Sequence, residues 1–283
     1  MKLIAFDWAI KGILRNKANF GILEGFLTEL LKFDVKIQTI LESESNQFSE
    51  SDKFNKVDLL CENTNKELIL IELQYNQELD YLLRMLYGVS KLICESVEKG
   101  MSYGEIKKVY SINIVYFDLG TGDDYVYYGS TRFIGLHTQH ELELKPKHID
   151  TFKTETIAKL YPEYYILKIK AFPDELRDSL DEWIYLFKHD EIQPNFKAKG
   201  ILEAADKLKN YQMDKDEKYR YDNFVKAERS KISQMWTARI EGEEIGKKQK
   251  QIEIANKMKT EGLSIELISK LTGLNISELN DFS

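Results

Sequence analysis

Two acids and one amide stand at a spacing that could hold a metal ion. Glu72 and Gln74 are two residues apart in the apolar segment Leu68–Leu73, so on a β-strand their side chains lie on the same face. Asp58 belongs to the apolar segment before it. With a turn centred near Asn65, Asp58 faces Glu72 across a hairpin, and the two acids are roughly 5 Å apart.

Two carboxylates at that distance repel each other unless a cation lies between them. Mg²⁺ fits because it prefers oxygen ligands and keeps several bound waters, and Mn²⁺ is the alternative ion. Such an ion polarises a phosphoryl oxygen and lowers the pKa of a bound water, which is the chemistry of phosphodiester hydrolysis. Gln74 could orient that water or contact a phosphate, but it cannot act as a general base. The wet face of an ordinary hairpin carries the same residue types, so spacing alone leaves both interpretations open.

The elements around the hairpin follow the order helix, strand, hairpin, helix, strand, or αβββαβ. Apolar periodicity predicts a helix over residues 6–32 and a strand over residues 35–41. Residues 78–99 are predicted to form the second helix, and residues 109–117 a buried central strand. Further strands are expected at 125–136 and 163–170. The apolar side of the second helix is expected to comprise Leu79, Leu82, Leu83, Leu86, Val89, Leu92 and Ile93.

The sequence changes character towards the C-terminus. It predicts an α/β domain over residues 1–190, a charged helical connector over residues 191–250 and a small tail over residues 251–283. In the tail, Ser264 is placed to cap a short helix and Gly273 to end it. Two short helices joined by a turn with glycine are typical of a helix-turn-helix.

Composition sets limits on the class of protein. The chain has 283 residues, 43% of them apolar, and a net charge of -7. This negative charge argues against an extensive DNA-wrapping surface, because such surfaces are usually basic. Local basic patches can still hold phosphates, so a DNA-cutting enzyme remains compatible with it.

Cysteine usage and hydropathy point to a cytoplasmic protein without a membrane anchor. Cys61 and Cys94 lack partners at metal-ligand spacing, which argues against a zinc site, and both are expected to be buried, reduced thiols. The first residues lack the apolar length of a signal peptide. No segment approaches the ~20 apolar residues that a membrane span requires.

Several short motifs occur along the chain, and their order and spacing are specific when taken together. They are Phe6-Asp7-Trp8-Ala9-Ile10-Lys11, Lys56-Val57-Asp58-Leu59-Leu60, Ile71-Glu72-Leu73-Gln74, Arg84-Met85-Leu86-Tyr87, Glu261-Gly262-Leu263-Ser264-Ile265-Glu266 and Leu271-Thr272-Gly273-Leu274. With these motifs the chain resembles the PD-(D/E)XK nuclease-family transposases, also called the Rpn or recombination-promoting nuclease family. The resemblance implies a restriction-endonuclease-like αβββαβ core with a mixed central sheet, followed by a mostly helical C-terminal region.

The resemblance also implies roles for individual residues. Asp58 and Glu72 would bind Mg²⁺, and Gln74 would stand where the wider superfamily has a lysine. Glu24, on the first helix, would supply an extra acid, and its alternative is an ordinary surface carboxylate. Arg84 would hold a phosphate as a bidentate donor. Its alternative is a salt bridge with Asp80 on the same helix.

Three further residues are accessory candidates. Asp7 and Lys11 belong to the family-like opening motif. Lys11 shares a helix side with Arg15 and would touch DNA, although solvated charges fit the pattern equally well. Tyr87 is expected to have a packing role rather than a chemical one.

These observations lead to one functional hypothesis and one rival. The hypothesis is a Mg²⁺-dependent DNA endonuclease linked to recombination or to a mobile element. The rival is a non-catalytic DNA-binding or assembly protein on a decayed nuclease scaffold, which the uncharged Gln74 favours. DNA is the expected partner in both, and the C-terminal helices are candidates for binding DNA or for forming a homo-oligomer.

Overall fold

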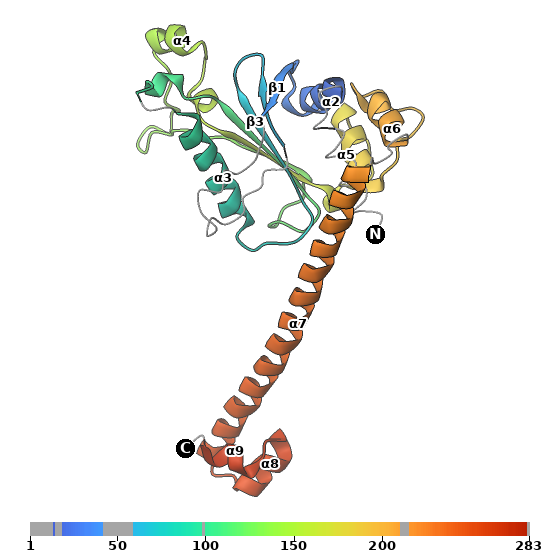
Figure 1. Ribbon diagram of the computed structural model, residues 1–283. Coiled ribbons are helices and arrows are strands. Elements are labelled where there is room, and N and C mark those ends of the chain that lie inside the picture. The colour runs from blue at the N-terminus through green and yellow to red at the C-terminus, as the bar shows by residue number, and fades with distance from the viewer. Residues whose placement is uncertain (1–13, 15–18, 42–58, 98–99, 210–214, 282–283) are drawn as a thin grey trace. The chain divides into compact units, whose positions relative to one another are not determined.

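The protein divides into two compact units, Met1–Gln212 and Met213–Ser283. The computed structural model describes residues 14, 19–41, 59–97, 100–209 and 215–281. The first unit contains a six-stranded sheet with helices on both of its faces (Figure 1). The second unit is helical in its described residues.

The sheet is mixed, as the sequence predicts, and its strands lie in the order β1-β2-β3-β4-β6-β5. The strands are β1 (Ile37–Leu41), β2 (Leu59–Asn63), β3 (Leu68–Gln74), β4 (Val109–Val115), β5 (Val126–Gly129) and β6 (Glu163–Lys168). β3, β4 and β6 run parallel to one another, whereas the pairs β1–β2, β2–β3 and β5–β6 are antiparallel. All seven residues of β4 are buried, which confirms the prediction of a central strand.

Helices cover both faces of the sheet, so a β3 residue and its chain neighbour enter different cores. Helices α2 (Phe20–Leu31), α5 (Ser179–His189) and α6 (Ile201–Lys209) supply the core on one face. Helix α3 (Tyr81–Ser96) covers the other face (Figure 1). The even-numbered positions of β3, which include Glu72, share the face that α3 covers.

The turn between β2 and β3 is built by the side chain of Asn63. Its Oδ1 accepts hydrogen bonds from the backbone N–H groups of Asn65 and Glu67, at 3.0 and 2.9 Å. Lys66 takes the left-handed conformation, with φ of 66°. An asparagine that folds back on its own backbone is a common way to close a tight turn, and the predicted hairpin is confirmed.

The buried side of α3 agrees with the prediction only in part: Val89 is buried, and Leu92 and Ile93 are half-buried against the same core cluster. Tyr81, Met85 and Val89 are buried against the sheet at intervals of four residues. The four leucines at positions 79, 82, 83 and 86 are instead exposed, and Leu83 keeps 68% of its surface accessible. The helix has two apolar stripes. The stripe that packs on the sheet is the one that contains Tyr81, whose hydroxyl donates a hydrogen bond to the buried side chain of Asn113. Hydrophobic periodicity carries no information about such a polar partner.

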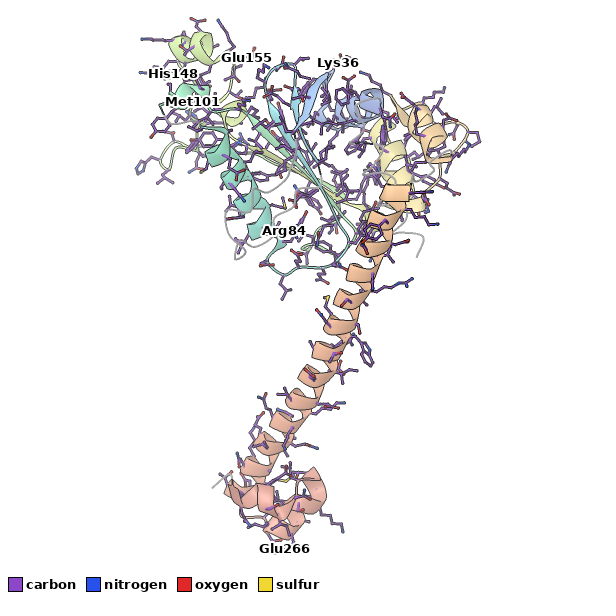
Figure 2. The ribbon with its side chains drawn as sticks, in the orientation of Figure 1. Lys36, Arg84, Met101, His148, Glu155 and Glu266 are labelled. Carbon is purple, nitrogen blue, oxygen red and sulfur yellow. The ribbon has the colours of Figure 1, made fainter. Side chains whose placement is uncertain are left out.

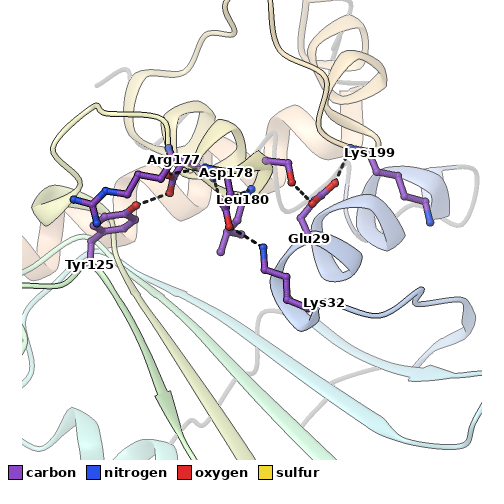
Figure 3. A network of polar contacts seen from close by, with 9 residues as sticks. Glu29, Lys32, Tyr125, Arg177, Asp178, Leu180 and Lys199 are labelled. Atoms are coloured by element: carbon purple, nitrogen blue, oxygen red, sulfur yellow. Dashed lines mark hydrogen bonds and ion pairs between the residues drawn. The ribbon is translucent and has the colours of Figure 1, made fainter.

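A polar network joins α2, α5 and the start of β5 (Figure 3). Asp178 caps α5 by accepting hydrogen bonds from the N–H groups of Leu180 and Asp181, and it also accepts one from the Lys32 ammonium at 2.8 Å. Asp181 is buried and accepts a 2.7 Å hydrogen bond from the Tyr125 hydroxyl. These contacts fix the helical layer that lies on the far face from Glu72.

The remaining described segments are short helices and connections. They are η2 (Tyr103–Glu105), α4 (Pro146–Phe152), η3 (Ile157–Leu160) and η4 (Ile169–Ala171). The strand expected at 125–136 ends at Gly129, and only an isolated bridge joins Ile134 to Glu141. Cys61 is buried as predicted, but Cys94 is exposed, because α3 turns that position to solvent.

The second unit contains one long helix and a compact end. α7 (Lys215–Thr260) is followed by α8 (Ile265–Thr272) and α9 (Ile276–Asp281). The predicted caps are present: Ser264 accepts from the N–H of Leu267, and Gly273 has φ of 74°. Ala255 and Ile268 are central to the small core of this end. Among the described residues, no helix is long and apolar enough to cross a membrane.

Candidate active site

Glu72 is a buried acid near the end of β3. It is 6% exposed and lies on the face of the sheet that α3 covers. The antiparallel register of the hairpin pairs Leu59 with Ile71 at the last described position of β2. Asp58, the second acid of the predicted pair, precedes that position and lies outside the described residues, as do Asp7 and Lys11. Glu72 is therefore the one predicted metal ligand that the structure places.

Arg84, which Figure 2 labels, brings a positive charge to Glu72 from α3. Its Nε lies 3.9 Å from Oε2 of Glu72, and its Nη1 lies 2.9 and 3.0 Å from the two oxygens of Glu78. Arg84 therefore pairs with Glu72 and Glu78 rather than with Asp80, the partner in the alternative interpretation of this residue. Burial acts to lower the pKa of Arg84, but the hydrogen bond that Arg84 donates to Glu78 and the charge of Glu72 outweigh it and raise the pKa.

Gln74 also contacts Glu78. Its amide nitrogen donates to Oε1 of Glu78 at 3.0 Å and to the backbone oxygen of Asn76 at 3.1 Å. Glu78 therefore connects Gln74 with Arg84, and Arg84 faces Glu72. The result is a chain of alternating charges and dipoles across the end of β3 and the start of α3, with the predicted residues Glu72, Gln74 and Arg84 brought together.

A polar pair lies beside Glu72 on the neighbouring strand. Asn113 of β4 is in register with Glu72 and is buried. It accepts a hydrogen bond from the Tyr81 hydroxyl at 3.2 Å and donates to Ser111 Oγ at 3.0 Å. A buried amide with satisfied hydrogen bonds can hold a fixed orientation. The signal for this site in the sequence is the pair of polar residues, Ser111 and Asn113, two apart in an otherwise apolar strand.

Two accessory candidates do not join this cluster. Glu24 accepts hydrogen bonds from Lys36 Nζ at 3.0 Å and from the N–H of Ile37 at 2.9 Å, so both of its oxygens are used at the start of β1. Figure 2 shows Lys36 well away from Arg84. Tyr87 is 55% exposed on α3, so it contributes little to the packing that the sequence predicted for it. Its side chain faces solvent because position 87 lies on the opposite side of α3 from the buried residues Tyr81, Met85 and Val89.

The chemistry of Glu72 suits a divalent cation that prefers oxygen ligands, such as Mg²⁺ or Mn²⁺. Within the described ranges, no group of three or more His, Cys, Asp or Glu side chains is arranged to hold a metal ion. One carboxylate from Glu72 and a second from outside those ranges would be needed. A site with few protein ligands is what Mg²⁺ commonly uses, since it keeps several waters and also binds substrate phosphates.

The comparisons with known proteins bear on this geometry. The sequence matches the PD-(D/E)XK nuclease family transposases over residues 4–238, which includes the whole sheet and the Glu72 cluster. Neither the curated proteins nor the solved structures give a match. The matched range is well over half of the chain and contains the αβββαβ core described above, so the chain belongs to the PD-(D/E)XK nuclease family of transposases.

Proposed function

We propose that this protein is a cytoplasmic, Mg²⁺-dependent DNA endonuclease linked to recombination or to a mobile element. Asp58 and Glu72 would hold the ion. The observation that carries this proposal is the position of Glu72: an acid buried on β3, one step beyond the last described pair of the hairpin, Leu59 with Ile71. If the same register continued by one step, position 58 would pair with Glu72, on the same face of the sheet.

A bound Mg²⁺ would polarise the scissile phosphodiester and lower the pKa of an attacking water. The residues of the chain would bind the ion and orient the phosphate. The Glu72 carboxylate sits on a strand with β4 and β2 on either side, so it has little freedom to move. Arg84 offers a planar guanidinium beside it, suited to a phosphate oxygen.

Gln74 acts in this proposal as a positioning residue. Its amide holds Glu78, and Glu78 holds Arg84 at 2.9 Å. The lysine of the wider superfamily would bring a charge to this position. Here the charge next to the candidate site comes from Arg84 instead, which supports the idea that the guanidinium has taken over contact with the phosphate.

The test is Mg²⁺-dependent nicking of a supercoiled plasmid by full-length protein. We expect Asp58→Asn and Glu72→Gln each to lower the rate at least 100-fold, because each removes one anionic ligand while keeping side-chain size. Glu95→Gln, an exposed acid on α3 paired with Lys91, is the matched control and should cleave like the parent. Cleavage at the parental rate by both site variants would show that the assignment is wrong.

The rival function is a non-catalytic DNA-binding or assembly protein on the same scaffold. It is favoured by Gln74, which is uncharged and donates its amide to groups of the protein. Calorimetric titration with Mn²⁺ and Mg²⁺ separates the two. Metal binding that is lost in Glu72→Gln supports the endonuclease. DNA binding without any metal binding would favour the rival.

The C-terminal tail, residues 251–283, is proposed to bind DNA or to help assembly. Within the predicted connector, residues 191–250, α6 belongs to the core of the first unit, so only the part of α7 up to residue 250 is proposed to connect. The supporting observation is the small closed core around Ile268, which gives the tail a fold of its own in contact with the end of α7. Deleting residues 261–283 and measuring DNA affinity together with mass in solution tests both roles. A loss of DNA affinity at unchanged mass would assign the tail to DNA.

A further inference from the structure

Helix α7 exposes apolar side chains in a long, strongly polar sequence. It runs for 46 residues, and between Lys215 and Gln251 none of the side chains that the structure describes is buried. Ile232, Met235 and Trp236 are exposed within this stretch, and Trp236 keeps 64% of its surface accessible. Most helical stability in proteins comes from packing of an apolar face, so an exposed tryptophan on this polar helix indicates a surface that a partner covers.

Ile232, Trp236 and Ile240 form one face of the helix, and Met235 lies about 100° from Trp236, outside it. At 100° per residue, Ile232 and Ile240 lie about 40° to either side of Trp236. We name the face that these three residues define the Trp236 face. Charged residues continue it in both directions: Arg229 lies about 20° from Trp236 on the N-terminal side, and Glu243 lies about 20° away on the C-terminal side.

We propose that the Trp236 face binds the Trp236 face of a second copy of this chain, with the two helices antiparallel and the two-fold axis at Trp236. In this arrangement Trp236 meets Trp236, and Ile232 of each copy meets Ile240 of the other. Arg229 of each copy meets Glu243 of the other. A two-fold axis gives every contact twice, which is the property of a closed, isologous dimer.

The charges select the antiparallel arrangement. Two helical turns beyond Arg229 and Glu243, Asp222 and Lys250 also lie on this face, at equal distances from Trp236. The antiparallel dimer pairs them as well. A parallel dimer would place Arg229 opposite Arg229 and Glu243 opposite Glu243. Like charges at facing positions are destabilising, so one orientation pairs opposite charges at both levels and the other opposes like charges at both.

The contacts of Glu243 and Lys250 do not prevent this pairing. Glu243 now accepts a hydrogen bond from Arg239 on its own helix at 2.9 Å, and Lys250 pairs with Glu253. These are exposed pairs within one helix, which contribute little to stability and rearrange readily. The inference concerns α7 alone and holds whether or not the chain cuts DNA.

The first test is the mass of the full-length protein by sedimentation equilibrium across a range of concentrations. We expect a dimer for the parent and a monomer for Trp236→Ser at the same concentration. Ile245→Ser is the matched control, since Ile245 is equally exposed on the opposite side of α7 and its loss should leave the dimer intact. A parent that stays monomeric, or a Trp236→Ser variant that stays dimeric, overturns the proposal.

The second test is charge reversal. Arg229→Glu and Glu243→Lys should each raise the dimer dissociation constant roughly 3- to 10-fold, and the double variant should restore it. Restoration cannot come from the Arg239–Glu243 contact, because the double variant still lacks it. No restoration overturns the pairing.

Orientation is checked by cross-linking in a Cys94→Ser background, which removes the exposed native thiol. The single variant Glu243→Cys should not form a disulfide-linked dimer, because its two thiols would lie on the order of 20 Å from each other along the helices. The double variant Arg229→Cys/Glu243→Cys should form one. Efficient linkage through Glu243→Cys alone would identify a parallel dimer and overturn the antiparallel one.

Discussion

Glu72 and Arg84 face each other from the sheet and from the helix that covers it, with Nε of the arginine 3.9 Å from Oε2 of the glutamate. Neither side chain is open to solvent to any large degree, at 8% for Glu72 and 23% for Arg84. A buried carboxylate carries a large desolvation cost, and a nearby guanidinium offsets part of it. The pair therefore keeps an acid on β3 in a place where an apolar residue would otherwise be expected.

Removing the positive charge of Arg84 should destabilise the protein more than replacing the guanidinium with an ammonium group. We expect Arg84→Gln to lower the free energy of unfolding by about 1–3 kcal/mol, because two acids lose their cation. Arg84→Lys keeps the charge but loses the fork that contacts Glu78 and faces Glu72 together, so its effect should be smaller. Urea unfolding of the two variants and of Glu78→Gln measures this. A double-mutant cycle for Arg84 and Glu78 that shows no coupling would contradict the contact.

The carboxylate of Glu62 should make the stability of the fold depend on pH. Glu62 is buried and accepts hydrogen bonds from Lys107 and Lys66. The hydrogen bond from Lys107 lowers its pKa below the ordinary value of 4.5, although burial opposes the shift. A lowered pKa in the folded state stabilises the fold above about pH 4.5, and this contribution is lost as the pH falls further.

We therefore expect the free energy of unfolding to fall between about pH 5 and pH 3, and to fall less steeply in Glu62→Gln than in the parent. Glu95→Gln is the control, because Glu95 is an exposed acid whose pair with Lys91 is long, at 3.7 Å. Unfolding in urea at a series of pH values gives both slopes. Equal slopes for the parent and Glu62→Gln would show that Glu62 does not carry this dependence.

The sheet could be predicted from the sequence because its strands are continuous apolar runs. Residues 109–117 have the composition of a strand that is covered on both faces, and β4 is that strand. The hairpin was predictable because polar turn residues separate two such runs, and Asn63 supplies the closing hydrogen bonds. Periodicity and turn chemistry are local properties, so a single sequence reports them.

The sequence did not predict which side chains contact one another, whether the residues are far apart or close together in the chain. The buried stripe of α3 follows from the hydrogen bond between Tyr81 and Asn113, residues 32 positions apart. The link between Gln74 and Arg84 passes through Glu78, an acid that no motif identified. Helical spacing shows which side chains share a face, but only the partner surface decides which face is covered.

The two cysteines should differ in reactivity. Cys61 is buried in β2, and burial raises its thiol pKa to about 12, so little thiolate forms at neutral or mildly alkaline pH. Cys94 is exposed on α3. We expect a thiol reagent at pH 8 to label one cysteine rapidly and the second only after unfolding. Mass spectrometry of Cys94→Ser after the same treatment should find no rapid label, and rapid labelling there would contradict the burial of Cys61.

Position 74 should accept a donor and reject an acceptor. Gln74 uses its amide nitrogen twice, towards Asn76 and towards Glu78. Lysine in its place retains donors for both groups and pairs its charge with Glu78. Glutamate would oppose Glu78 at about hydrogen-bonding distance, and like charges that close destabilise the fold by roughly 1 kcal/mol or more.

We therefore expect Gln74→Lys to unfold at the parental urea concentration or above it, and Gln74→Glu clearly below it. If the proposed nuclease function holds, Gln74→Glu also loses at least tenfold in plasmid nicking, because a displaced Glu78 no longer holds Arg84 beside Glu72. Unfolding and nicking are measured on the same preparations. Equal stability of the lysine and glutamate variants would mean that the contact with Glu78 does not form in solution, whatever the nicking rates are.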